Sequence, residues 1–169
     1  MDEARELKVA SRTGTLLGSM SKVMGETQYA DDLSLPRMLY CRILRSTHPH
    51  AKISAIDTSR ALKRKGVLAV ITGKDLPIPY GILPVSQDEE ALCVEKVRMV
   101  GDPVAAVAAL DEETAEAALE DIRVEYEPLP TVMSVQEGLA ETDAQIHEYA
   151  DQGNIHKFVS LEFGDMEEG

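Results

Sequence analysis

An apolar segment followed by a helix signal constrains the fold of this chain more than any other feature. Residues 104–110 read Val-Ala-Ala-Val-Ala-Ala-Leu, an unbroken apolar run of strand length. Asp111 follows and predicts a helix that continues to about Asp121, because a short carboxylate can accept from the free amide groups of a first helical turn. Apolar residues at 115, 118, 119 and 122 give this helix one buried face.

The segment after this helix alternates between apolar and charged residues. In residues 123–127, Val124 and Tyr126 fall on one side and the charged residues on the other. Strand, helix and strand at this spacing predict an α/β (α+β) domain, with a mixed sheet and short crossover helices. The unit itself is interpreted as a βαβ crossover or a closely similar α/β layer.

Further strands are expected before this unit. Residues 38–45 alternate, with Leu39, Cys41 and Ile43 facing one way and Tyr40 and Arg42 the other. A second short strand is predicted at 51–56, a brief helix between an N-cap signal at 57–59 and a stop at Gly66, and a buried strand at 67–71.

The remaining segments carry weaker periodicity. Residues 1–36 are expected to be an extended arm that packs on the domain, and 77–90, with three prolines, a long loop. A short helix is expected near 134–140 and a strand at 157–163. The sequence therefore predicts one domain over 1–130, arm included, and a connector with the start of a further domain over 131–169.

The charge of the chain excludes several classes of partner. A net charge of −13 repels the phosphates of nucleic acids and anionic lipids, so no nucleic-acid or membrane partner is expected. The run at 104–110 is too short to cross a bilayer. Residues 1–6 are charged and without an apolar core, which is not the pattern of a signal peptide.

The two cysteines, Cys41 and Cys93, are far apart and form no CxxC motif. Such spacing makes neither a metal site nor a disulfide framework. Both are interpreted as buried, reduced thiols of a cytoplasmic protein.

Two histidines are the first candidates for a functional site. His48 and His50 are two residues apart, so on a strand both would face one side. A metal site normally needs at least three protein ligands, and Pro49 interrupts the strand. Local hydrogen bonding of both imidazoles, where the strand turns, is the favoured interpretation.

Other patterns are weighed in the same way. Ser46-Thr47-His48 could suggest a nucleophile beside its base, but no third group is present to hold the base. Gly14, Gly18 and Gly101-Asp102 lack the order of a phosphate-binding loop. Glu125 and Glu127 could suggest paired acid and base catalysts, but they are expected on a solvated strand face. Gly101 is expected to allow a tight turn. No catalytic, cofactor-binding or metal-binding residue is therefore predicted in this chain.

Several segments occur in an order that unrelated folds have no reason to repeat. They are 25–32, 39–57, 66–72 with 75–77, 96–98, 100–107, 115–118 and 124–130. This ordered set resembles the α/β hammerhead domain of the xanthine dehydrogenase and aldehyde oxidase superfamily, and the resemblance covers roughly residues 12–165. Residues 79–84 and 101–109 look most like the large subunit of 4-hydroxybenzoyl-CoA reductase.

The resemblance implies the amino-terminal domain of a large subunit that binds molybdopterin. In the family, the cofactor loops and the catalytic glutamate come much later, and residues 163–165 look like the first turn of the following cofactor domain. It implies an architectural role in a hydroxylase or a reductive dehydroxylase. Molybdenum would lie in the full subunit, whose partners are the remaining molybdopterin-binding domains, an iron–sulfur subunit with [2Fe-2S] clusters, and possibly an FAD subunit. The alternative is a stand-alone hammerhead module for binding or assembly, without redox activity.

Overall fold

The computed structural model describes residues 18–81, 87–140, 144–148, 153–165 and 167. The chain divides into two compact units, 1–38 and 39–169. The described part of the first unit contains the helix α1 (Ser19–Val23) and the 3-10 turn η1 (Ala30–Asp32). The expected packing of this arm on the domain stays a prediction.

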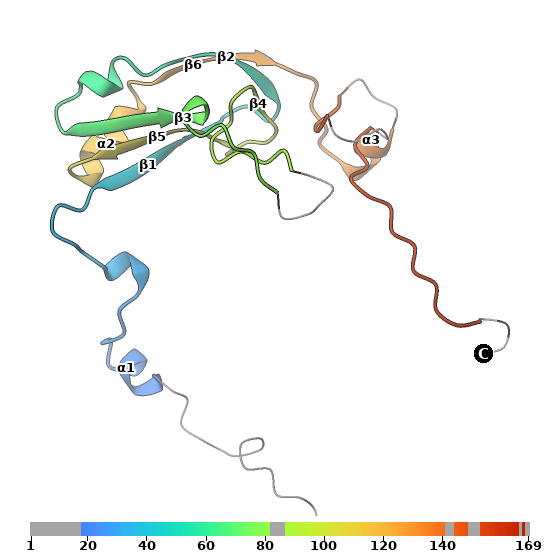
Figure 1. Cartoon of the computed structure of the whole chain (residues 1–169), viewed down its shortest axis with the longest axis horizontal. Helices are drawn as coiled ribbons and strands as arrows, with labels where there is room; N and C mark the ends of the chain where they lie inside the picture. Colours follow the sequence, from blue (N-terminus) through green and yellow to red (C-terminus); the bar gives the residue numbers. More distant parts are fainter. Residues whose placement is uncertain (1–17, 82–86, 141–143, 149–152, 166, 168–169) are drawn as a thin grey trace, which may run out of the picture. The chain divides into compact units, whose positions relative to one another are not determined.

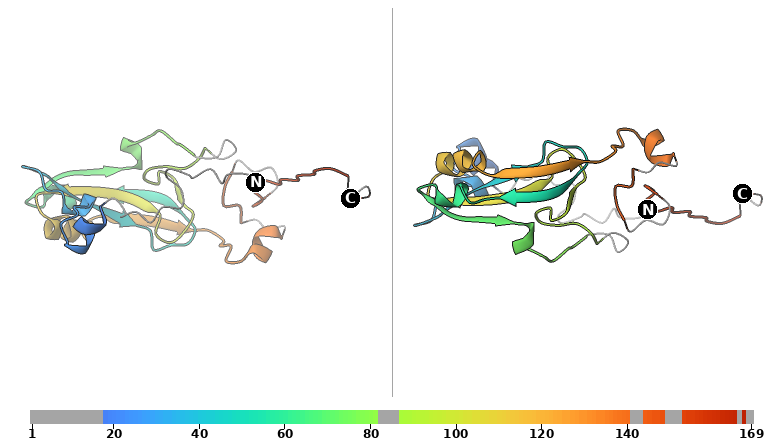
Figure 2. Two further views of the ribbon diagram at one scale, coloured as in Figure 1. Left: turned by 90° about the horizontal axis from the view of Figure 1, so that it is seen from below. Right: turned by 90° about the horizontal axis from the view of Figure 1, so that it is seen from above.

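The second unit contains two three-stranded sheets, whose strands lie roughly along a common axis (Figures 1 and 2). One sheet has the order β1-β5-β3, with β1 at Tyr40–Arg45, β5 at Pro103–Ala109 and β3 at Val67–Thr72. The other has the order β4-β2-β6, with β4 at Lys96–Val97, β2 at Ala51–Asp57 and β6 at Arg123–Pro128.

The predicted α/β class is confirmed, but the expected βαβ crossover is wrong. Helix α2 (Glu112–Leu119) connects β5 to β6, and these two strands lie in different sheets. All four strand pairs are antiparallel, so no mixed sheet forms among the described residues. Local periodicity indicates where the elements lie, whereas the pairing is decided by contacts between distant segments: β5 lies between β1 and β3, and β6 pairs with β2.

Helix α2 begins as predicted and covers one face of the β1-β5-β3 sheet. The Asp111 carboxylate accepts a hydrogen bond from the amide of Thr114 at 2.8 Å. The buried side chains of Ala105 and Val107 on β5 pack against Ala118 of this helix. We call this side of the sheet its inner face.

The two sheets share one core. A second buried cluster joins Ala51 of β2, Cys93, Val97 of β4 and Val104 of β5. Ile56 and Val124, from β2 and β6, contact both clusters. The predicted alternation of β6 is confirmed, since Val124 and Tyr126 turn toward this core.

The other side of the β1-β5-β3 sheet is open to solvent, and two sequence interpretations fail there. Residues 67–71 do form a strand, but β3 is an edge strand with Leu68 and Ile71 exposed. Cys41 is exposed rather than buried, because Leu44 and not Ile43 enters the core from β1. We call this side the outer face. By the strand register it carries Cys41, Ile43, Ala69, Ile71, Ala106 and Ala108.

The connector contains the predicted short helix. Helix α3 (Val135–Leu139) begins at Ser134, whose hydroxyl accepts from the amide of Glu137 at 3.2 Å. The expected strand at 157–163 is wrong, since this segment is neither strand nor helix and Phe158 and Phe163 are exposed. No helix in the described part of the chain is long and apolar enough to cross a membrane.

The shorter predictions hold in the described residues. The carboxylate of Asp57 accepts from the amide of Ser59 at 2.9 Å and precedes a brief 3-10 turn, η2 (Ala61–Lys63). The predicted loop 77–90 contains one isolated bridge between Tyr80 and Glu89, and part of it lies outside the described residues.

Candidate functional site

The two histidines near the end of β1 have different surroundings. The His48 ring lies 4.6 Å from the Tyr126 ring, centroid to centroid. His50 is 5% exposed, and its Nδ1 lies 2.6 Å from the carbonyl oxygen of Pro130. Since a carbonyl only accepts, Nδ1 carries the proton and donates, which leaves Nε2 buried without a partner. The expected local hydrogen bond of His50 is therefore wrong, because its partner is distant in the sequence.

Serine, glycine and glutamate candidates take structural positions. The Ser46 hydroxyl donates to the carbonyl oxygen of His48 and accepts from its amide, each at 3.0 Å, so it closes a turn. Gly101 has a φ of 97° and confirms the predicted tight turn. Glu125 and Glu127 are exposed on β6, as expected. Gly14 lies outside the described residues.

The Asp102 side chain fixes the same turn from within. Its Oδ2 accepts from the amides of Arg98 at 2.6 Å and Met99 at 3.1 Å. The amide of Gly101 in turn donates to the carbonyl oxygen of Ser46 at 2.8 Å. A carboxylate that receives two backbone amides holds the loop before β5 and is not directed at a bound phosphate.

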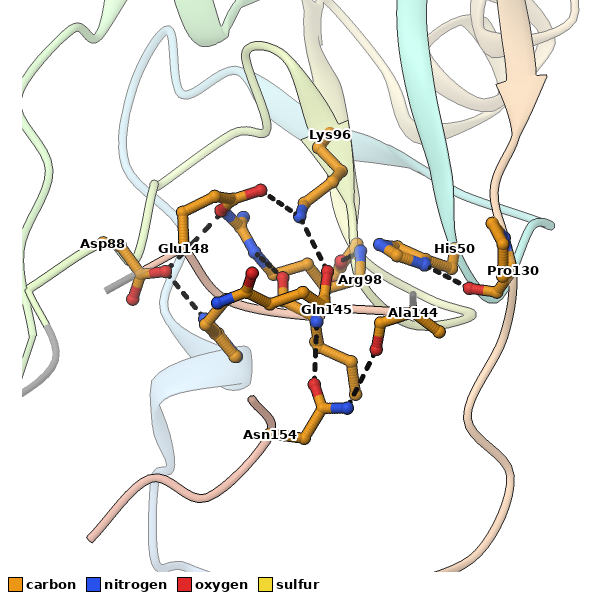
Figure 3. Close-up of polar contacts among 12 residues, drawn as sticks. His50, Asp88, Lys96, Arg98, Pro130, Ala144, Gln145, Glu148 and Asn154 are labelled. Atoms are coloured by element: carbon orange, nitrogen blue, oxygen red, sulfur yellow. Dashed lines mark hydrogen bonds and ion pairs between the residues drawn. The ribbon is translucent and has the colours of Figure 1, made fainter. Parts of the chain in front are cut away.

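A cluster of polar contacts around Lys96 and Arg98 was not predicted from the sequence (Figure 3). The Lys96 ammonium is largely buried and forms an ion pair with Glu148. It also donates to the carbonyl oxygen of Gln145 at 3.4 Å. Burial alone would raise the pKa of Glu148, but the hydrogen bond and charge of Lys96, with a backbone hydrogen bond and the charge of Arg98, together outweigh it, so that the pKa lies below its usual value.

Arg98 reaches the same segment from the adjacent loop. Its Nε donates to the carbonyl oxygen of Ile146 at 3.1 Å, and its guanidinium lies 3.4 Å from Glu148 and 3.6 Å from Asp88. The other side-chain contact of the Asp88 carboxylate is with Nδ1 of His147, at 2.6 Å. The two cations thus bind the carboxylates and carbonyls of residues 144–148.

Asn154 completes the cluster by closing the connector on itself. Its side-chain oxygen accepts from the amide of Ile146 at 2.9 Å, and its side-chain nitrogen donates to the carbonyl oxygen of Ala144 at 2.8 Å. We call this set the connector cluster. Its members are Asp88, Lys96, Arg98, Ala144, Gln145, Ile146, His147, Glu148 and Asn154.

The chemistry of the connector cluster is that of a structural clamp. Its cations are matched by carboxylates and backbone carbonyls, and among its described residues the buried side-chain oxygen without a hydrogen bond is Oδ1 of Asp88. The contacts that Asp88, Lys96 and Arg98 make with the connector join residues 48 to 59 positions apart, and no local pattern of the sequence could predict them. The only local hint was the pair of cations two residues apart, at Lys96 and Arg98.

The hollows found among the described residues are either small or open to solvent. A cavity of about 70 Å³ lies between β2 and the loop that carries Cys93, far below the ~300 Å³ of a small-molecule site. A hollow of about 340 Å³ beside Arg60, Lys63, Arg64 and Asp121 is wide open to solvent and does not enclose a ligand. Burial, with Asp102 and Glu90 nearby, raises the pKa of the Cys93 thiol to about 12. No group of three or more His, Cys, Asp or Glu side chains that could hold a metal exists in the described ranges.

The fold and these contacts define a two-sheet α/β domain whose polar side chains hold its own loops and connector. Comparison with known proteins gives the family. Residues 24–130 match the model for the a/b hammerhead domain of aldehyde oxidase and xanthine dehydrogenase, and the chain belongs to this family. The hammerhead fold expected from the sequence is thereby confirmed.

Individual relatives agree with this assignment. The chain is 47% identical to a probable xanthine dehydrogenase subunit of Bacillus subtilis, over 88% of this chain and 20% of that protein. It is 36% identical to the nicotinate dehydrogenase large molybdopterin subunit of Eubacterium barkeri, over 96% of this chain and 38% of that protein. The structure of aldehyde oxidoreductase from Desulfovibrio gigas superposes with a TM-score of 0.70 at 35% identity, covering 78% of this chain and 16% of that one. The chain thus spans well under half the length of these relatives.

Proposed function

We propose that this chain is the amino-terminal structural domain of the large subunit of a molybdenum-cofactor oxidoreductase, with no catalytic role of its own. The observation that carries the proposal is the use of the connector cluster. The largely buried Lys96 and the neighbouring Arg98 bind residues within 144–148, so two cations of the domain hold the chain that leaves it. A domain built in this way positions a following segment and performs no chemistry itself.

Cofactors and partners follow from the same proposal. The relative from Eubacterium barkeri is named a large molybdopterin subunit. For the present protein, molybdopterin would be held by the remaining molybdopterin-binding domains, with [2Fe-2S] clusters and FAD on partner subunits or domains. The boundary near Pro130, an iron–sulfur subunit as partner, and a cytoplasmic location belong to the proposal.

The particular reaction is a finer proposal. Residues 79–84 and 101–109 resemble the large subunit of 4-hydroxybenzoyl-CoA reductase, which supports a reductive dehydroxylation rather than a hydroxylation. An assay of the complete enzyme with 4-hydroxybenzoyl-CoA, a purine and an aldehyde separates the two. Turnover of only the purine or the aldehyde would discard the dehydroxylase.

A chimera tests the structural role. The 150 residues of the Bacillus subtilis relative that match this chain are replaced by their counterparts here, and a second version simply lacks them. We expect the chimera to assemble and retain molybdenum and the deleted version to lose both. A chimera that folds but retains no molybdenum, beside an intact parent enzyme, would contradict the proposal.

A further inference from the structure

The outer face of the β1-β5-β3 sheet is a continuous apolar surface. The register aligns two rows across the three strands, one with Ala108 at its centre and one with Ala106. No charged side chain lies in either row. The rows are Cys41–Ala108–Ala69 and Ile43–Ala106–Ile71.

The shape of this surface is as distinctive as its composition. Alanines occupy the central strand β5, while the larger Ile43 and Ile71 stand on the two edge strands, 41% and 37% exposed. In the row of Ala106, a small side chain on the central strand therefore lies between two larger apolar ones on the edge strands. Contiguous apolar patches of this kind mark contact surfaces, because an isolated soluble domain gains nothing from exposing them.

We infer that the outer face is the surface by which this domain docks on the remainder of the large subunit, with an apolar segment of that remainder lying along β5. The inference rests on the proposed function and specifies which surface of the domain makes the contact. Relatives of the chain are much longer than the chain, and it covers only 20% and 38% of two of them. In these relatives most of the subunit lies outside the part that matches this chain, so the remainder offers a large surface for docking.

Charge favours this occupant over a second copy. Two copies, each with a net charge of −13, repel each other. Permanent contacts within one subunit resemble a divided protein core and exclude charge from their centre, as the outer face does. A transient partner would instead be expected to meet a more polar surface.

Cys41 is a reporter on this surface, next to Ala108 of the central strand. It is exposed on the outer face, whereas Cys93 is buried and its pKa is raised to about 12. Iodoacetamide labelling at pH 8, followed by peptide mass mapping, therefore reads Cys41. We expect labelling to be fast in the isolated chain and roughly tenfold slower or more in the assembled chimera, because thiol reactivity follows access.

Substitutions test whether the face itself makes the contact. Ile43→Lys and Ile71→Lys place a charge on the outer face at positions that are already partly exposed. Leu62→Lys is the matched control, since Leu62 is also exposed but lies on η2, beside Ala61 of the inner core. All three add the same charge, and circular dichroism of the isolated variants shows whether each still folds.

The outcomes separate the inference from the proposed function. We expect the Ile43 and Ile71 variants to fold alone but to prevent assembly of the chimera, while Leu62→Lys assembles normally. Equal labelling of Cys41 before and after assembly, or assembly of all three variants, overturns the inference and leaves the proposed function standing. Slow labelling of Cys41 in the isolated chain also overturns the inference, because the outer face would then already be covered. The molecular mass in solution would show whether a second copy covers it, as in a dimer, or residues 18–38 of the same chain, as in a monomer. If the unmodified chimera fails to assemble, the result contradicts both the inference and the proposed function.

Discussion

Ala105 and Ala106 are neighbours on β5, yet they lie on opposite faces of the same sheet. Ala105 is 0% exposed and packs on the inner face, in the cluster that includes Ala118 of α2. Ala106 is 8% exposed and lies between Ile43 and Ile71 on the outer face. Two adjacent alanines therefore report on different environments, the closed core on one side of the sheet and the outer face on the other.

This pair gives a direct test of the layer arrangement. Ala105→Asp should lower the free energy of unfolding by on the order of 3 kcal/mol or more, because its carboxylate would lose solvation without gaining a partner. Ala106→Asp should cost on the order of 1 kcal/mol, since its carboxylate can turn to solvent. Glu125→Ala, on the solvated face of β6, should change it by about 0.5 kcal/mol or less. Urea denaturation measures all three, and equal midpoints for the two aspartate variants would mean that the faces are misassigned.

The cysteines should differ sharply in reactivity. In the native chain at pH 8, one thiol should react quickly with a disulfide reagent, because Cys41 is exposed and the buried Cys93 thiol, with a pKa of about 12, stays protonated. Both thiols should react in denaturant. The variant Cys41→Ser should lose the fast reaction, and a fast reaction that survives in it would show that Cys93 is accessible.

Local patterns of the sequence predict individual elements well. The Asp111 cap, the short helix after Ser134 and the turn at Gly101 all form where the sequence places them, because each depends on neighbouring residues. Local patterns do not predict which face of a strand is buried. On β1 both alternating sets hold apolar residues, and only the position of α2 decides that Leu44 is buried and Ile43 exposed.

Long-range relationships could not be predicted in the same way. Lys96 and Arg98 find their partners about fifty positions later, and no local period links those segments. The pairing of β5 with β1 and β3, in place of a crossover to β6, likewise depends on the whole chain. Family resemblance supplied the fold where periodicity could not.

The connector cluster should weaken in acid. The pKa of Glu148 is lowered because the hydrogen bond and charge of Lys96, a backbone hydrogen bond and the charge of Arg98 together outweigh the effect of burial. A lowered pKa means that this contact stabilises the fold above the usual glutamate value of 4.5 and is lost as the pH falls below it. Carboxyl NMR should show Glu148 titrating below 4.5, with the amides of 144–148 following.

Removal of the cation is the control for that titration. In Lys96→Gln the pKa of Glu148 should rise toward or above its usual value, since burial then acts with less opposition. An unchanged titration in this variant would show that Lys96 does not hold the connector.

The purified chain should contain no stoichiometric molybdenum, pterin or flavin and should not turn over purines, aldehydes or 4-hydroxybenzoyl-CoA. The physical reason is that the hollows found among the described residues are either small, at about 70 Å³, or open to solvent, and that these residues contain no group of side chains that could hold a metal. Metal analysis and absorption spectra of the purified chain provide the measurement. A metal content near one per chain, retained through gel filtration, would contradict this expectation.

The central strand, the connector and the tail of the second unit should differ in their rates of amide hydrogen exchange. Amides of β5 should be strongly protected, since this strand is paired on both sides and its inner face is buried. Residues 155–163 should exchange fast, because they form neither strand nor helix and leave large side chains such as Phe158 exposed to 83%. Residues 144–148 should fall between, since the connector cluster holds them, and Arg98→Gln should move them toward the fast group while leaving β5 unchanged. Equal protection of 155–163 and β5 in the monomer would show that the tail is integral to this domain, and would move its boundary beyond Pro130.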